Sequence, residues 1–93
     1  MKFDESLVEK VFENIYDEKE RSSAVSRIKY ALQNMQKQGE RNGWEIWYVR
    51  VSGKTMGYIQ YYEKRFRYIL AQIFKRPFSI TYYKKEIVIA VKK

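Results

Sequence analysis

Apolar residues recur at three- and four-residue spacing along the first third of the chain. In residues 3–20 they form one face, which consists of Leu7, Val8, Val11, Phe12 and Ile15. This spacing is typical of an amphipathic helix. Ser6 and Glu9 have the spacing of a capping box at its start. We therefore predict a helix over residues 3–20 with an acidic outer face.

A second stretch with helical spacing covers residues 22–38. Its apolar stripe consists of Val25, Ile28, Leu32 and Met35. Gly39 is a typical residue for the end of a helix, because it adopts left-handed backbone conformations easily. We predict a helix over residues 22–38 and a loop from Gly39 to Gly43.

From Trp44 the pattern changes to one that favours strands. Residues 44–51 read WEIWYVRV, which is rich in aromatic and β-branched residues, and Ser52-Gly53 is a turn signal. The tail has two further β-prone runs, SITYY and EIVIAV, on either side of Lys84-Lys85. We predict a strand at 44–51 and a hairpin in the tail; a short helix over residues 84–93 is the alternative.

The pattern of residues 56–74 fits two structures. The apolar positions that match a helical template are Ile59, Tyr62, Phe66, Ile69, Leu70 and Ile73, and Pro77 would end that helix. Phe66, Tyr68 and Leu70 also alternate with their neighbours as in a strand, and residues 63–65 resemble a hairpin turn. Periodicity alone does not choose between the two.

The expected fold is therefore α+β, with a single domain over residues 1–93. If residues 56–74 form a hairpin, two N-terminal helices pack on a small twisted antiparallel sheet. If residues 56–74 are helical, the fold has three helices and a three-stranded sheet.

Composition restricts the chemistry. The chain has no cysteine and no histidine, which excludes disulfides, thiolate nucleophiles, imidazole catalysis and the usual zinc or haem ligands. We expect no metal site and no cofactor. No apolar run approaches the ~18 residues of a membrane span, so we expect a cytoplasmic protein without a membrane partner.

Charge is unevenly distributed. Residues 1–20 carry three cations and seven anions, whereas residues 21–93 carry sixteen cations and four anions, within a net charge of +8. A dense positive potential is what a phosphate backbone selects for. A solvated lysine and arginine surface that only maintains solubility is the alternative. We predict a nucleic-acid partner, RNA ahead of DNA.

Two groups of residues are candidates for phosphate chemistry. Arg50 and Lys54 flank the Ser52-Gly53 turn and could clamp a phosphate, although a solvated hairpin tip has the same pattern. In the second group, Arg76 could neutralise a pentavalent phosphate and Tyr82 could hydrogen-bond the attacking hydroxyl. Lys75 and Tyr83 adjoin this pair as further nucleic-acid contacts. The alternative for this second group is that Arg76 only ends a strand and that the tyrosines pack half-buried.

A third group combines aromatic rings with cations. Its rings are Trp44, Trp47, Tyr48, Tyr58, Tyr61, Tyr62 and Tyr68, and they are interleaved with Lys64, Arg65 and Arg67. Nucleic-acid bases stack on such rings while cations follow the backbone. Most of these rings must nevertheless belong to the core, because the chain has few other large apolar groups.

In chain order, these pieces resemble the RelE/HigB superfamily of toxin ribonucleases. The resemblance rests on the helical segment SRIKYALQNMQKQG, a strand that opens WEI, a Gly-Lys turn, a strand with paired tyrosines, the strand RYILAQIF followed by KR, and the ending KKEIVIA. It covers about residues 10–90. Two features depart from the family: MGYIQYY lacks the cation of the middle strand, and a helix stands where the family opens with a strand.

This resemblance implies an endoribonuclease that cleaves mRNA on the ribosome and is neutralised by an antitoxin protein. Lys54 or Tyr82 would help to deprotonate the 2′-hydroxyl, and Arg76 would stabilise the transition state. The further RNA contacts would be Arg50, Lys64, Arg65, Arg67, Lys75 and Tyr83.

Two other functions fit the sequence. The first is a winged-helix-like DNA-binding protein without catalysis, in which residues 22–38 form the recognition helix with Arg27 and Lys29 toward the major groove. Residues 52–55 would then form the wing. The second is a viral or plasmid inhibitor module that covers a host protein with its aromatic and basic face.

Overall fold

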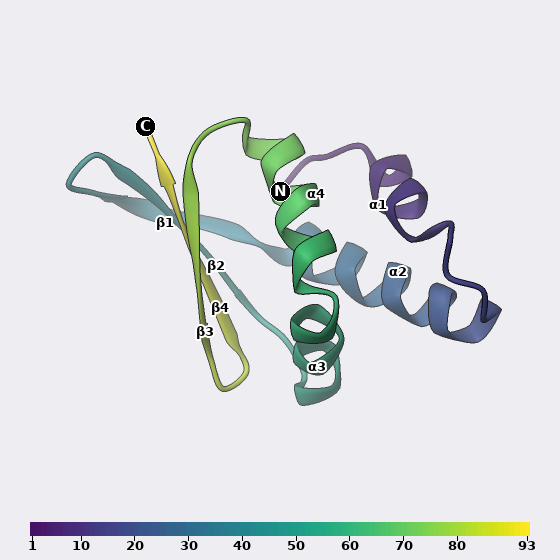
Figure 1. The fold of residues 1–93 in the computed structure, drawn as a ribbon. Helices are drawn as coiled ribbons and strands as arrows, with labels where there is room; N and C mark the ends of the chain where they lie inside the picture. Colours follow the sequence, from purple (N-terminus) through teal and green to yellow (C-terminus); the bar gives the residue numbers. More distant parts are fainter.

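The computed structural model describes residues 1–93 and shows an α+β fold in which all four helices lie on one side of a four-stranded sheet (Figure 1). The elements are α1 (Glu5–Phe12), α2 (Glu18–Asn34), β1 (Gln36–Arg41), β2 (Trp44–Arg50), α3 (Gly53–Tyr61), α4 (Glu63–Phe74), β3 (Phe78–Tyr83) and β4 (Glu86–Lys92). The strand order is β1-β2-β4-β3, and every pair is antiparallel. The α+β class is confirmed. The expected element counts are wrong, and the helices are not confined to the N-terminal part.

The two N-terminal helices exist, but their predicted boundaries are wrong. Asp4 caps α1 by accepting a hydrogen bond from the Ser6 amide at 3.0 Å, so the cap lies before the predicted capping box. Asp17 caps α2 by accepting from the Glu20 amide at 3.0 Å. An aspartate cap satisfies an otherwise unpaired amide at the start of a helix. The acidic stretch predicted as one helix is therefore divided between two.

The loop predicted from Gly39 to Gly43 is wrong, because most of it belongs to a β1–β2 hairpin. Asn42 (φ 54°) and Gly43 (φ 83°) both have left-handed backbone conformations. Such a pair makes the two-residue turn whose twist matches that of paired strands. β1 is exposed at every position, so it has no apolar period from which a strand could be predicted. The strand predicted at 44–51 is confirmed as β2.

The hairpin alternative for residues 56–74 is wrong, because these residues lie in α3 and α4. Ser52 caps α3 by accepting from the Thr55 amide at 3.1 Å, so the predicted turn is a helix start. Phe66 and Leu70 are fully buried on α4, whereas Tyr68 between them is 54% exposed. Alternation would have placed all three side chains on one face. Lys75 (φ 55°) ends α4 before the proline.

The predicted tail hairpin is confirmed as β3 and β4, so the alternative of a terminal helix is wrong. Alternate β4 residues Ile87, Ile89 and Val91 are fully buried against the helices. The core lies between this inner face of the sheet and the apolar sides of the four helices. No helix has both the length and the apolar composition needed to cross a lipid bilayer.

Candidate nucleic-acid interface

The second face of the sheet carries large side chains that no helix covers. Because side chains alternate along a strand, the residues next to the buried ones point to this side. We call this surface the outer face; from β1 to β3 it contains Gln36, Gly39, Arg41, Trp44, Ile46, Tyr48, Arg50, Glu86, Val88, Ala90, Lys92, Ser79, Thr81 and Tyr83. None of its apolar members packs against the core. The fold thus leaves an aromatic surface open to solvent.

The strand register places a row of residues without aromatic rings between two rings. Ile46 of β2 lies opposite Gly39 and Ala90, and Ser79 follows on β3. Trp44 lies on one side of this row, and Tyr48 lies on the other. The row and the Trp44 ring border a depression of about 300 Å³, which is lined by Arg41, Asn42, Trp44, Ile46, Ser79 and Ala90.

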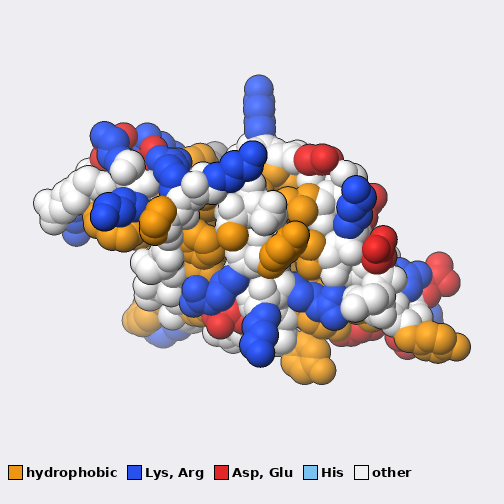
Figure 2. Space-filling model, turned by 45° about the horizontal axis from the view of Figure 1, so that its top comes forward, with side chains coloured by type: hydrophobic (Ala, Val, Ile, Leu, Met, Phe, Trp, Pro, Cys, Tyr) orange, Lys and Arg blue, Asp and Glu red, His pale blue; other side chains and the backbone are white.

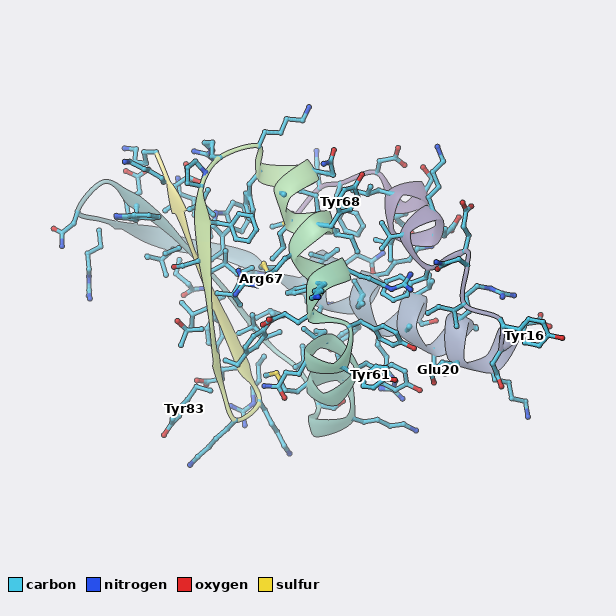
Figure 3. All side chains as sticks on the ribbon, viewed as in Figure 1. Tyr16, Glu20, Tyr61, Arg67, Tyr68 and Tyr83 are labelled. Carbon is cyan, nitrogen blue, oxygen red and sulfur yellow. The ribbon has the colours of Figure 1, made fainter.

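The rings of the outer face are held in place in different ways. The Tyr48 hydroxyl donates a 2.8 Å hydrogen bond to the Glu86 carboxylate, which raises the pKa of Tyr48. Tyr83 is 60% exposed, and the Lys84 ammonium lies 5.4 Å from the centre of its ring. Figure 3 shows Tyr83 pointing away from the helices. The outer face therefore presents rings at both ends of the sheet.

The sheet layer is also the more basic half of the molecule. Residues 36–50 and 75–93 carry nine cations and three anions, whereas the helical layer carries ten cations and eight anions. Most acidic side chains visible in Figure 2 lie on its right, toward α1 and the start of α2. A polyanion would therefore meet its strongest attraction at the sheet.

Ion pairs and hydrogen bonds occupy some of the cations in each layer. In the helical layer, Lys29 binds Glu9 at 2.7 Å, and Arg21 and Arg65 donate to backbone carbonyls at 2.6 Å. In the sheet layer, several cations have no carboxylate within 4.0 Å, namely Arg41, Lys75, Lys84, Lys85 and Lys92. Of these unpaired cations, Arg41 and Lys92 lie on the outer face, whereas the Lys85 side chain lies beside Gly53 at the start of α3.

The structure does not bring the three predicted catalytic residues together. Lys54 lies in the first turn of α3, near the β3–β4 turn, since the position of Gly53 adjoins the Lys85 side chain. Arg76 follows α4 at the opposite end of the sheet. Its guanidinium donates two 3.2 Å hydrogen bonds to the Glu45 carboxylate. The length of α3 and α4 thus separates the two cations.

Tyr82 lies on the inner face of β3, one residue before the end of this strand. Its hydroxyl is buried and forms no hydrogen bond. Burial, followed by the nearby Glu63 carboxylate, raises the pKa of Tyr82. A buried phenol with a raised pKa is a poor base at neutral pH.

The other predicted contact residues fall into two groups. Arg50 and Tyr83 lie on the outer face, where Arg50 pairs loosely with Glu86 at 3.4 Å. Exposed Lys75 follows α4, and exposed Lys64 begins it. Two predicted contacts serve the helical layer instead: Arg65 joins α4 to the α1–α2 segment, and Arg67 pairs with Glu63 at 3.5 Å. The predicted set is therefore divided between the two layers.

Of the residues that line the depression, sequence reasoning singled out only Trp44. Trp44 and Tyr48 were in the aromatic set, but the period of two along β2 does not reveal which face is covered. Arg41 and Asn42 fell in a segment predicted as a loop. The Asn-Gly pair at residues 42–43 is a strong hairpin signal, and it could have placed Arg41 and Asn42 at a β-turn.

Other hollows are weaker candidates. One of about 540 Å³ lies between α2 and the start of α3, and its lining is Ser22, Ser23, Ser26, Arg27, Tyr30, Ser52 and Thr55. Its one cation, Arg27, donates to the Thr55 hydroxyl at 3.1 Å and lies over the Tyr58 ring. No three metal-ligating side chains lie together anywhere in the structure.

No family model, curated protein or solved structure matches this chain. The candidate interface is therefore defined by its own residues: an uncovered aromatic sheet face, a depression beside Trp44, and unpaired cations around them.

Proposed function

We propose that this protein binds single-stranded nucleic acid on the outer face, with RNA preferred to DNA. The observation that carries this proposal is the row of residues without aromatic rings between Trp44 and Tyr48, on a face that no helix covers. Bases of a single strand can enter such a row and stack on the flanking rings. In a duplex the same base faces are already stacked on their neighbours.

The energetics favour a site in which rings stack on the bases and cations pair with the phosphates. Base–aromatic stacking contributes about 1–3 kcal/mol per base, and cations along the face neutralise the phosphates. Lys92 lies opposite Trp44, and Arg50 lies at the other end of β2. A strand that crosses from Trp44 to Tyr48 would therefore meet a cation near each ring.

The preference for RNA rests on hydroxyl groups. Ser79, Thr81 and Tyr83 follow one another along the outer side of β3. Their hydroxyls can donate to or accept from a ribose 2′-hydroxyl, the group that distinguishes RNA from DNA.

The ribonuclease and the winged-helix DNA-binding protein each need their functional residues in a specific arrangement. The ribosome-dependent ribonuclease needs Lys54, Arg76 and Tyr82 in one place, and strands where the chain forms α3 and α4. In the winged-helix alternative, the predicted wing is the start of α3, and Lys29 is paired with Glu5 and Glu9. The outer face therefore supports single-strand binding better than it supports either of these functions.

The test is binding of short fluorescent oligonucleotides to the full chain, measured by anisotropy at low salt. Trp44→Ala should weaken binding of single-stranded RNA roughly tenfold, since one stacked base is lost. Tyr16→Ala is the matched control, because Tyr16 is fully exposed at the far end of the helical layer (Figure 3). Its removal should change nothing.

Three results would contradict the proposal. They are absence of oligonucleotide binding at low salt, unchanged binding in folded Trp44→Ala, and tighter binding of duplex than of single strands. The first result would favour a protein partner on the same face. DNA that binds as well as RNA of the same sequence would remove the RNA preference alone.

A further inference from the structure

The depression beside Trp44 has the chemistry of a base-reading site. Its apolar lining is Trp44, Ile46 and Ala90, and its polar lining is Arg41, Asn42 and Ser79. None of the three polar side chains forms a hydrogen bond within the protein, and Arg41 has no carboxylate within 4.0 Å. The neighbouring Lys37, Arg76 and Lys93 are all paired with Glu40 or Glu45. The hydrogen-bonding groups of Arg41, Asn42 and Ser79 are thus exposed at this hollow and free to meet a ligand.

We infer that this depression selects guanine within a single strand, an inference that rests on the proposed function. The Arg41 guanidinium offers two parallel donors, which match the O6 and N7 acceptors on one edge of guanine. Adenine presents a donor beside its N7 and cannot accept both bonds. Uracil lacks two adjacent acceptors, and cytosine, which has O2 and N3, lacks the N1–H and N2–H₂ donors that guanine carries on its other edge.

The other edge of guanine carries N–H donors, and the depression has acceptors for them. The Asn42 side-chain carbonyl and the Ser79 hydroxyl can both accept hydrogen bonds. Asn42 lies at the β1–β2 turn, and Ser79 lies on the edge strand β3, so the two border the depression on different sides. Trp44 supplies the stacking surface, while Gly39 and Ala90 leave room above the sheet.

The turn geometry fixes this arrangement. Asn42 has a left-handed conformation with φ 54°, and Arg41 precedes it in register with Trp44. The two-residue turn therefore places the backbone of Arg41 directly opposite Trp44, from where its guanidinium can reach a base that stacks on this ring. A longer, irregular loop would not position both groups on one side of the sheet.

The experiment compares two oligouridylates that differ only in their central nucleotide, guanosine or adenosine. The wild-type chain should bind the guanosine oligonucleotide roughly tenfold more tightly, as a bidentate arginine pair provides. Substituting 7-deazaguanosine, which lacks the N7 acceptor, should remove most of this ratio.

Arg41→Lys keeps the charge but loses the fork, so the ratio of the two affinities should fall toward one. The ratio cancels any general weakening of binding. Arg67→Lys is the matched control, because Arg67 lies on α4 and pairs with Glu63; its ratio should equal that of the wild type. Circular dichroism checks that each variant is folded.

Two outcomes distinguish failure of this inference from failure of the proposed function. If both oligonucleotides bind with equal affinity, or if Arg41→Lys keeps the wild-type ratio, guanine selection is overturned while single-strand binding stands. If neither oligonucleotide binds at low salt, the proposed function and the inference both fail.

Discussion

Arg76 shows how the structure gives a predicted catalytic residue a different role. Its guanidinium holds the Glu45 carboxylate on the inner side of the β1–β2 hairpin. Arg76, followed by the Trp47 indole N–H, lowers the pKa of Glu45. A lowered folded-state pKa means that this pair stabilises the fold above the ordinary carboxyl pKa of 4.5. The stabilisation is lost as the pH falls through the lower, folded-state value.

We therefore expect Arg76→Ala to lower the denaturant midpoint of unfolding at pH 7. The difference from wild type should shrink as the pH falls below 4.5, because Glu45 becomes protonated in both proteins. Urea unfolding across this pH range measures it. Lys75→Ala is the control, since exposed Lys75 has no carboxylate partner and should show no such pH dependence. A pH-independent difference for Arg76→Ala would contradict the assigned role.

At the scale of elements, local signals and tertiary packing compete. Ser52-Gly53 is a turn signal, but Ser52 is also a favoured residue before a helix. Burial decides between them, because Met56, Ile59, Phe66 and Ile69 can all face the core only if the segment is helical. The result is that α3 and α4 cover the inner face of the sheet.

Ser52→Ala should reduce the free energy of unfolding by about 1 kcal/mol, through loss of the cap on α3. Ser52→Asp keeps an acceptor for the Thr55 amide and should retain most of the stability. Chemical denaturation monitored by circular dichroism compares the two. Equal destabilisation by both substitutions would show that the cap hydrogen bond is not the cause.

Over the whole molecule, the two layers differ in charge and in how their charges are used. In the helical layer, Lys29 and Arg65 link helices, whereas Arg41 and Lys92 on the outer face have no carboxylate within 4.0 Å. Long-range attraction of a polyanion depends on where the charges lie as well as on their sum. We therefore expect the position of the cations, more than the net charge, to determine the binding of nucleic acid to this protein.

Two double variants with the same net charge test this. Arg50→Glu with Lys92→Glu should greatly weaken nucleic-acid binding and flatten its salt dependence, by about 0.7 in the logarithmic slope per lost phosphate contact. Lys10→Glu with Lys19→Glu alters the helical layer by the same charge and should leave the slope almost unchanged. Equal losses in both double variants would indicate that only net charge matters.

The sequence by itself determined the α+β class, β2 and the tail hairpin, because their apolar periods and turn residues agree. It also determined the chemistry that is excluded, since that depends on residue types alone. Only the tertiary structure decided the helical state of residues 56–74, the polar strand β1 and the face of β2 that stays open. Each of these depends on which surface is buried, and burial is set by contacts between residues far apart in the chain. The candidate site follows from the last decision: Arg41, Asn42, Trp44, Ser79 and Ala90 become neighbours only when β1, β2, β4 and β3 pair.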